Sequence, residues 1–181
     1  MSSSLTTLAL DHIEIINNTP EFLTTIQTIR NGGFINKIDV DNSPDDEDGS
    51  LGIVIWTPEL RDLVRSWYNL AEIVDSTMDL TVYRVLKLPK KTIKNGKIEM
   101  MLPFSTSFNL RFSVDWAQHN NRSLLMIKVP KNTKYTILDP PGEGDEEVIL
   151  PPLKLKINDI KKIRIGNKMK SVLMVEIESI M

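Results

Sequence analysis

An arginine stands inside an otherwise apolar run near the middle of the sequence. Arg84 is surrounded by Leu80, Val82, Leu86 and Leu88, a pattern that predicts a strand. A guanidinium held on a strand is a fixed, forked and permanently charged donor, which suits a phosphate. The alternative is an edge-strand arginine whose head reaches water, and Arg84 alone does not decide between the two.

A Ser-Thr-Ser triplet follows, between two phenylalanines. On an extended backbone Ser105 and Ser107 project to one face and Thr106 to the other. The two serines could present hydroxyls to a polar ligand or to a carboxylate, while Phe104 and Phe108 anchor the strand. Such a triplet is weak evidence when taken alone.

Two carboxylates stand at the entrance of a later apolar run. Residues 140–144 read Pro-Pro-Gly-Glu-Gly, which cannot continue a helix or a central strand and therefore predicts a loop. Asp145 and Glu147 follow it and face the same way on an extended backbone. The simpler interpretation is an acidic turn before a strand, but a rigid strand can also aim a carboxylate at a ligand.

The elements that would position these side chains are helices first and strands afterwards. Apolar residues recur at helical spacings in residues 1–38, ending near Gly32 and Gly33. Thr57 and Pro58 form an N-cap followed by proline at the first helical position, and an apolar stripe through Trp67 predicts a core-facing helix. Strands are predicted at residues 80–88, 97–102, 104–108, 123–129, 134–138, 147–150, 153–157 and 171–178.

This order of elements indicates an α+β fold, with N-terminal helices followed by a strand-rich mixed sheet. We expect a single domain, 1–181, in which residues 1–79 are mainly helical and residues 80–181 form the strand-rich core. A chain of 181 residues is long enough for one such core and does not require two.

Composition narrows the classes of function. The absence of cysteine excludes disulfides, thiolate nucleophiles and Cys-ligated zinc. A net charge of −2 gives no support to electrostatically driven nucleic-acid binding. No apolar run could span a bilayer and no secretory signal is visible, so we expect a soluble protein that acts in the cytoplasm of its own or a host cell.

Three other features have simpler interpretations. Residues 39–49 could be a calcium loop, but Pro44 and Ser50 replace the glycine and glutamate that such a loop needs, so a solvated acidic loop is favoured. His12 and His119 lie in no metal-ligand pattern and are expected at the surface or at its boundary. The basic stretch of residues 154–170 is interpreted as solvated faces of strands or helices, with a phosphate or nucleic-acid partner as the alternative.

The three motifs, in this order, resemble the ADP-ribosyltransferase family of the arginine–serine–glutamate class, which includes bacterial toxins, phage enzymes and vertebrate cell-surface enzymes. That family has a strand arginine, often after tyrosine, then Phe-Ser-Thr-Ser, then Glu/Gln-x-Glu running into an apolar strand and proline. This sequence has Tyr83 and Arg84, then residues 104–107, then residues 145–151. The gaps of 21 and 42 residues are similar to those of compact members, and the resemblance covers about residues 80–178.

The resemblance implies an enzyme that cleaves the nicotinamide–ribose bond of NAD and transfers ADP-ribose to a macromolecule. Glu147 would bond the ribose 2′-hydroxyl and stabilise the positive ribosyl centre, and Arg84 would hold a pyrophosphate oxygen. Ser105 would orient Glu147 or the ribose, and Asp145 would face the incoming nucleophile. NAD is the expected substrate, with no metal and no membrane involved, and a protein acceptor is expected, with nucleic acid as the alternative. The implied catalytic residues are Glu147, Asp145 and Ser105, and the implied NAD-binding residues are Arg84, Tyr83, Ser105, Thr106, Ser107 and Phe108.

Two positions depart from the family pattern. Val85 stands where glycine is frequent, and Asp145 stands where glutamate or glutamine is usual. They leave open a catalytically inactive binding module of the same fold, and an NAD glycohydrolase. A third alternative is an interaction domain rich in β-strands and outside the family, which would be excluded if Arg84, Ser105 and Glu147 lined one cleft.

Overall fold

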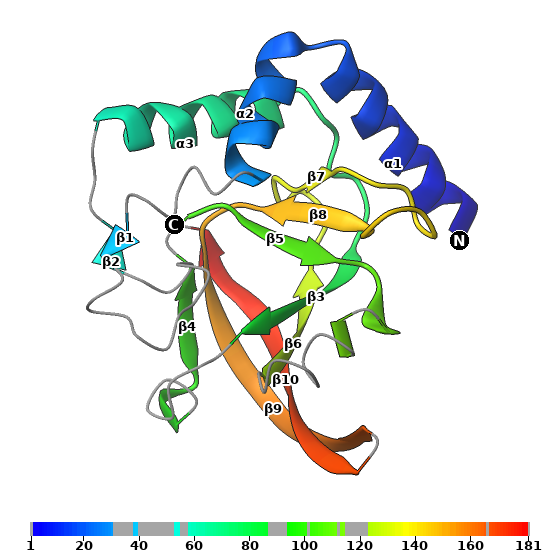
Figure 1. Ribbon diagram of the computed structural model, residues 1–181, viewed down its shortest axis with the longest axis vertical. Helices are drawn as coiled ribbons and strands as arrows, with labels where there is room; N and C mark the ends of the chain where they lie inside the picture. Colours follow the sequence, from blue (N-terminus) through cyan, green and yellow to red (C-terminus); the bar gives the residue numbers. More distant parts are fainter. Residues whose placement is uncertain are drawn as a thin grey trace.

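The computed structural model describes residues 2–30, 38–39, 53–54, 58–86, 94–100, 102–111, 113–114, 123–165 and 167–180. Residues 40–50, which include most of the segment considered as a calcium loop, lie outside the described residues, and so does His119. The fold is α+β, with helices first and strands afterwards (Figure 1). The elements are α1 (Ser2–Asn17), α2 (Pro20–Arg30), β1 (Ile38–Asp39), β2 (Ile53–Val54), α3 (Pro58–Ala71), β3 (Leu80–Leu86), β4 (Lys97–Met100), β5 (Phe104–Ser107), β6 (Ser123–Val129), β7 (Thr136–Ile137), β8 (Glu147–Leu150), β9 (Leu153–Ile165) and β10 (Lys168–Ile180).

Proline marks the start of two helices. Pro20 begins α2 and Pro58 begins α3, where the missing amide hydrogen costs nothing and the fixed φ suits the helix. Only two residues separate α1 from α2, and the carbonyl of Thr19 accepts hydrogen bonds from the amides of Phe22 (2.9 Å) and Leu23 (3.1 Å). The apolar stripe of α3 is core, as its spacing predicts, because Trp67 is fully buried.

Within the described residues, the main sheet has the strand order β4-β9-β10-β6-β3-β5-β8-β7. The pairing of β6 with β10 is parallel, and the other neighbours pair antiparallel. Strands β3, β5 and β8 are consecutive in the sheet although they are far apart in the sequence. The three motifs of interest therefore lie on neighbouring strands.

The helices support the end of the sheet that carries β5, β8 and β7 (Figure 1). Ile149 of β8 is fully buried in a cluster with Phe22 and Ile26 of α2 and Trp67 of α3. A second cluster packs Leu8 and Ala9 of α1 against the apolar residues of the main sheet. The N-terminal helices are thus part of the platform on which β8 rests.

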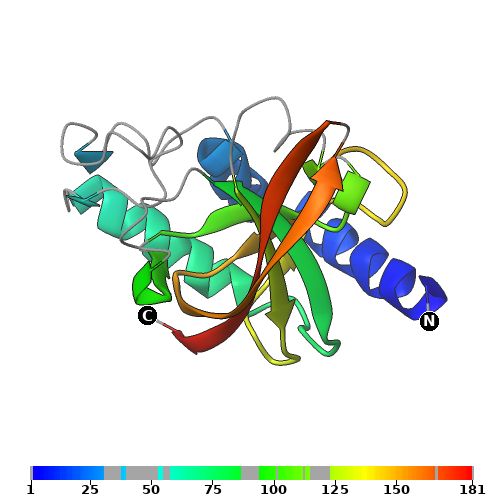
Figure 2. The same ribbon diagram turned by 90° about the horizontal axis from the view of Figure 1, so that it is seen from below.

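The two C-terminal strands are longer than the sequence predicts. Strands β9 and β10 each span 13 residues and form one hairpin, whereas the apolar pattern predicts only residues 153–157 and 171–178. β6 pairs only with Val172–Glu176 and β4 only with Leu153–Lys156, so the outer half of the hairpin is two-stranded within the described residues. It projects away from the helices, and Figure 2 views it from that end.

The exposed lysines and arginine on this outer half agree with the solvated-face interpretation of the basic stretch, except that Lys170 is buried. No helix of the described residues is both long and apolar enough to cross a membrane.

His12 is buried, which corrects the expectation of a surface position. Its Nδ1 accepts a hydrogen bond from the amide of Ile137 (3.0 Å), and its Nε2 bonds the carbonyl of Asp75. Its ring also stacks on Tyr135, with ring centroids 5.9 Å apart. Both ring nitrogens are used in the neutral form, so the side chain ties α1 to β7. Burial lowers the pKa of His12 below its ordinary value of 6.5, opposed in part by the hydrogen bond to Asp75 and by the charges of Asp75 and Asp11.

This burial makes the fold sensitive to acid. Because the unfolded chain takes up a proton near the ordinary pKa of 6.5 and the folded chain does so only at lower pH, stability is lost as the pH falls below about 6.5. We predict that His12→Gln, which can keep both hydrogen bonds but does not titrate, loses less free energy of unfolding between pH 7 and pH 5 than the wild type. Urea unfolding at both pH values measures this. Parallel pH dependences in the two proteins would contradict it.

Candidate active site

Three neighbouring strands bring the three sequence motifs together. Tyr83 of β3 pairs with Ser107 of β5, and Ser107 pairs in turn with Glu147 of β8. Residues separated by 64 positions in the sequence are therefore in register across three strands. The pairing thus brings the three motifs onto adjacent parts of one sheet.

A continuous set of contacts connects the arginine with the glutamate. Nη1 of Arg84 donates a hydrogen bond to the backbone carbonyl of Ser105 (3.0 Å). The hydroxyl of Ser105 donates to Oε2 of Glu147 (3.2 Å). Arg84, Ser105 and Glu147 are all partly buried. The Ser105 hydroxyl thus contacts the carboxylate, while the guanidinium contacts the backbone of the same serine.

The other two residues of the triplet, Thr106 and Ser107, make hydrogen bonds to backbone groups around β8. The hydroxyl of Thr106 is buried and donates to the carbonyl of Val148 (2.8 Å). The hydroxyl of Ser107 donates to the carbonyl of Asp145 (2.7 Å) and accepts from the amide of Asn109 (2.9 Å). These contacts connect β5 with β8 and with the acidic loop before it.

The aromatic residues of the motifs are placed differently. Tyr83 lies on the face of β3 opposite to Arg84 and packs against Val85, Leu124 and Val172; burial raises the pKa of its hydroxyl. The side chain of Phe108 packs against the main core, and its amide donates to the carbonyl of Glu146 (3.0 Å). Tyr83 thus belongs to the hydrophobic packing beside β3, and Phe108 links the end of β5 to the acidic loop.

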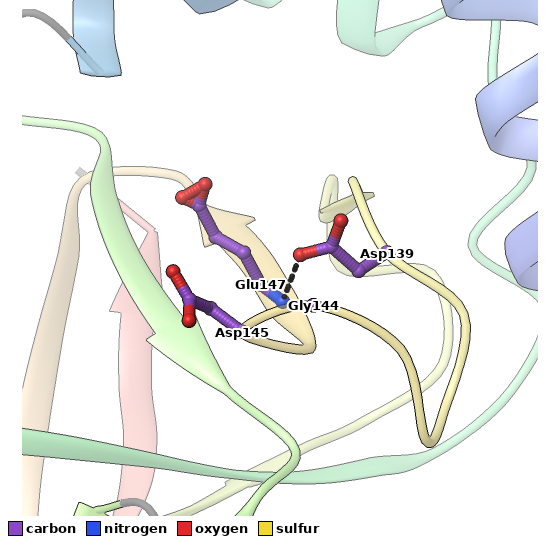
Figure 3. A pocket seen from close by; sticks show the side chains of 4 residues that line it. All are labelled: Asp139, Gly144, Asp145 and Glu147. Carbon is purple, nitrogen blue, oxygen red and sulfur yellow. Dashed lines mark hydrogen bonds between the residues drawn. The ribbon is translucent and has the colours of Figure 1, made fainter.

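The loop before β8 is held from both sides. Gly142, Gly144 and Glu146 have φ angles of 87°, 57° and 50°, which turn the backbone back toward β8. The carboxylate of Asp139 accepts a hydrogen bond from the amide of Glu147 (3.0 Å; Figure 3). Sequence reasoning did not single out Asp139; its only signal is an acidic residue directly before a Pro-Pro-Gly turn.

The loop borders a pocket of about 470 Å³, lined by Asp139, Gly144, Asp145 and Glu147 (Figure 3). Its three carboxylates can stabilise positive charge or accept a proton. Arg84 and Ser105 do not line it, although Ser105 contacts the carboxylate of Glu147. A ligand with both a phosphate and a developing positive charge would have to extend from the pocket toward Arg84. In the described part of the chain no group of His, Asp and Glu side chains is arranged to hold a metal ion.

Solved structures with the same architecture belong to ADP-ribosyltransferase toxins. Plx2a from Paenibacillus larvae superposes with a TM-score of 0.65 at 17% identity, covering 98% of this chain and 96% of its own. The C3 exoenzyme of Clostridium limosum gives 0.63 at 12% identity, covering 99% and 95%. The toxin component BECa of C. perfringens, solved with NADH, gives 0.60 at 14% identity, covering 94% of this chain and 48% of its own.

This chain has the ADP-ribosyltransferase fold. It spans nearly all of the first two toxins and about half the length of BECa. No family model and no curated protein matches the sequence. At these low identities the likeness establishes the fold, and the chemistry has to be argued from this chain's own residues.

The contacts predict different effects for the two serines. Ser107→Ala removes the hydroxyl that holds the carbonyl of Asp145, so the free energy of unfolding should fall by about 1–2 kcal/mol, and a glutamate-specific protease should cleave faster at Glu143 and Glu146. The Ser105 hydroxyl, within the described part of the chain, bonds the side chain of Glu147 and not the loop backbone, so Ser105→Ala should leave the cleavage rate unchanged. Equal cleavage of Ser107→Ala and wild type would contradict the assigned role of Ser107.

Proposed function

We propose that this protein is an NAD-dependent mono-ADP-ribosyltransferase, with residues 80–181 forming the NAD-binding part of a single domain. The observation that carries the proposal is the series of contacts from Arg84 through Ser105 to Glu147. It links a forked cation on β3 to a carboxylate on β8 through strand β5, which lies between them, and a dinucleotide with a reactive ribose needs both charges. The fold shared with ADP-ribosyltransferase toxins, one of them solved with NADH, supports NAD as the substrate.

The chemistry suits a site made of fixed charges. The bond from the ribose C1′ carbon to the nicotinamide nitrogen breaks, the electron pair leaves with nicotinamide, and the ribose acquires oxocarbenium character. In this proposal Glu147 bonds the 2′-hydroxyl and stabilises the positive ribose, because a preorganised carboxylate needs no reorganisation as charge develops. Arg84 holds the pyrophosphate, and Ser105 orients Glu147. Tyr83, Thr106, Ser107 and Phe108 shape the NAD-binding surface around them.

Asp145 is the residue proposed to meet the acceptor. It is exposed, lines the pocket beside Glu147 and can orient a nucleophile or accept its proton. A protein acceptor is favoured over nucleic acid, because a pocket wall with three carboxylates repels a phosphate backbone. Where no acceptor is held, water can attack the same ribose carbon, and the product is then free ADP-ribose.

Incubation with labelled NAD separates these outcomes. Label on proteins of a cell lysate supports transfer, and release of ADP-ribose in the absence of lysate supports hydrolysis. Neither product, together with no NAD binding in calorimetry, would favour the inactive binding module.

The role of Glu147 predicts a loss of turnover without a loss of binding. Glu147→Gln keeps the shape of the side chain but removes a charge used mainly in the transition state. We expect NAD to bind with nearly the same dissociation constant and kcat to fall by about 100-fold or more. A kcat equal to that of the wild type would refute this role.

The role of Arg84 predicts the opposite pattern. Arg84→Lys retains the charge but cannot reproduce a forked pair of donors. We expect the dissociation constant for NAD to rise by about tenfold, measured by calorimetry. An unchanged constant would count against pyrophosphate binding at this residue.

A further inference from the structure

Three of the contacts that Glu147 makes fix the place where β8 begins. The hydroxyl of Ser105 bonds its side chain, and the amide of Leu138 donates to its carbonyl (2.9 Å). The third contact is with the side chain of Asp139, whose Oδ2 accepts from the amide of Glu147 at 3.0 Å (Figure 3). Asp139 thus binds the backbone of Glu147, which is the first residue of β8 and carries the proposed catalytic carboxylate.

The loop is also folded closely around the carboxylate of Asp139. A Cβ on Gly144 would lie 3.2 Å from the carboxyl carbon and 3.2 and 3.3 Å from the two oxygens of Asp139. A Cβ on Gly142 would meet nothing within 4 Å, although both glycines have positive φ. Of these two glycines, only Gly144 therefore lies so close to the Asp139 carboxylate that a side chain would contact it.

We propose that Asp139 is a positioning residue, which sets the aim of the Glu147 carboxylate by holding the Glu147 amide. The inference rests on the proposed function and adds to it a residue outside the three motifs. A carboxylate that must contact one ribose hydroxyl in the transition state loses effect steeply when it is displaced, and a misplacement of about 1 Å can cost roughly 100-fold in rate. The hydrogen bond from the amide is the contact that prevents this displacement on the loop side.

The first test compares Asp139→Ala with Asp139→Asn in NAD hydrolysis. The alanine variant removes the acceptor, so we expect kcat to fall by about 10- to 100-fold while KM for NAD changes by less than about threefold. The asparagine variant keeps a side-chain oxygen that can accept the same hydrogen bond and should recover most of the lost kcat. An unchanged kcat in Asp139→Ala, or equal losses in both variants, would overturn the positioning role.

A double-mutant cycle tests whether Asp139 acts through Glu147. In a Glu147→Gln background, Asp139→Ala should have little further effect on the residual rate, since the carboxylate that it positions is gone. Full additivity of the two losses would overturn the inference. Single-turnover measurements at high enzyme concentration make the low rates accessible.

The two glycines provide a test that leaves Asp139 in place. Gly144→Ala should lower kcat because the new methyl group displaces the Asp139 carboxylate. Gly142→Ala also puts a side chain at positive φ but without this contact, and should keep kcat close to that of the wild type. Equal kcat values in the two variants would overturn the role of the contact. This pair also carries the test if Asp139→Ala does not fold.

The inference and the proposed function fail in different ways. If the wild-type protein neither binds nor cleaves NAD, the proposed function fails. If the wild type is active, Glu147→Gln is inactive and Asp139→Ala is fully active, only the role of Asp139 fails.

Discussion

Antiparallel pairing of β5 with β8 places Ser107 opposite Glu147 and Ser105 opposite Ile149. Side chains alternate between the two faces of a strand, so this register puts Ser105, Ser107 and Glu147 on one face and Thr106 and Val148 on the other. A slip of one residue would exchange the faces and turn the carboxylate of Glu147 into the main core. The pairing itself thus decides whether the serine hydroxyl can reach the carboxylate.

Packing behind the strands keeps this register in place. Ile149 and Val148 are fully buried on opposite faces of β8 and anchor it in two separate clusters. His12 of α1 accepts a hydrogen bond from the amide of Ile137 in β7, and Ile137 pairs with Val148 in β8. The N-terminal helices, which carry no recognisable chemical motif, therefore support the strand that begins with Glu147.

Much of the fold follows from local patterns in the sequence. The bounds of β6 and β8 agree with the predicted runs 123–129 and 147–150, because each contains a short and mostly buried apolar run, residues 124–127 and 148–150. The start of α3 agrees because Thr57 and Pro58 are strong local signals. The inner parts of β9 and β10 are predicted, but the outer half of their hairpin is not, since it is exposed and lacks the alternation that a half-buried strand shows.

The site is only partly visible in the sequence, for a similar reason. Arg84, Ser105 and Glu147 are recognisable by type and order, and the contact between Ser105 and Glu147 that the resemblance implies is present. Asp139 and His12 each accept a hydrogen bond from a backbone amide, 8 and 125 residues away along the sequence. Such contacts produce no periodic pattern in the sequence. A single aspartate or histidine therefore does not reveal which backbone amide it binds.

Crystals of the Glu147→Gln variant grown with NAD test the central claim most directly, because the ligand should remain uncleaved. The account predicts density for the pyrophosphate within hydrogen-bonding distance of the Arg84 guanidinium, with the nicotinamide ribose beside residue 147 and Ser105. Density for NAD at another face of the molecule, or none at saturating NAD, would contradict it.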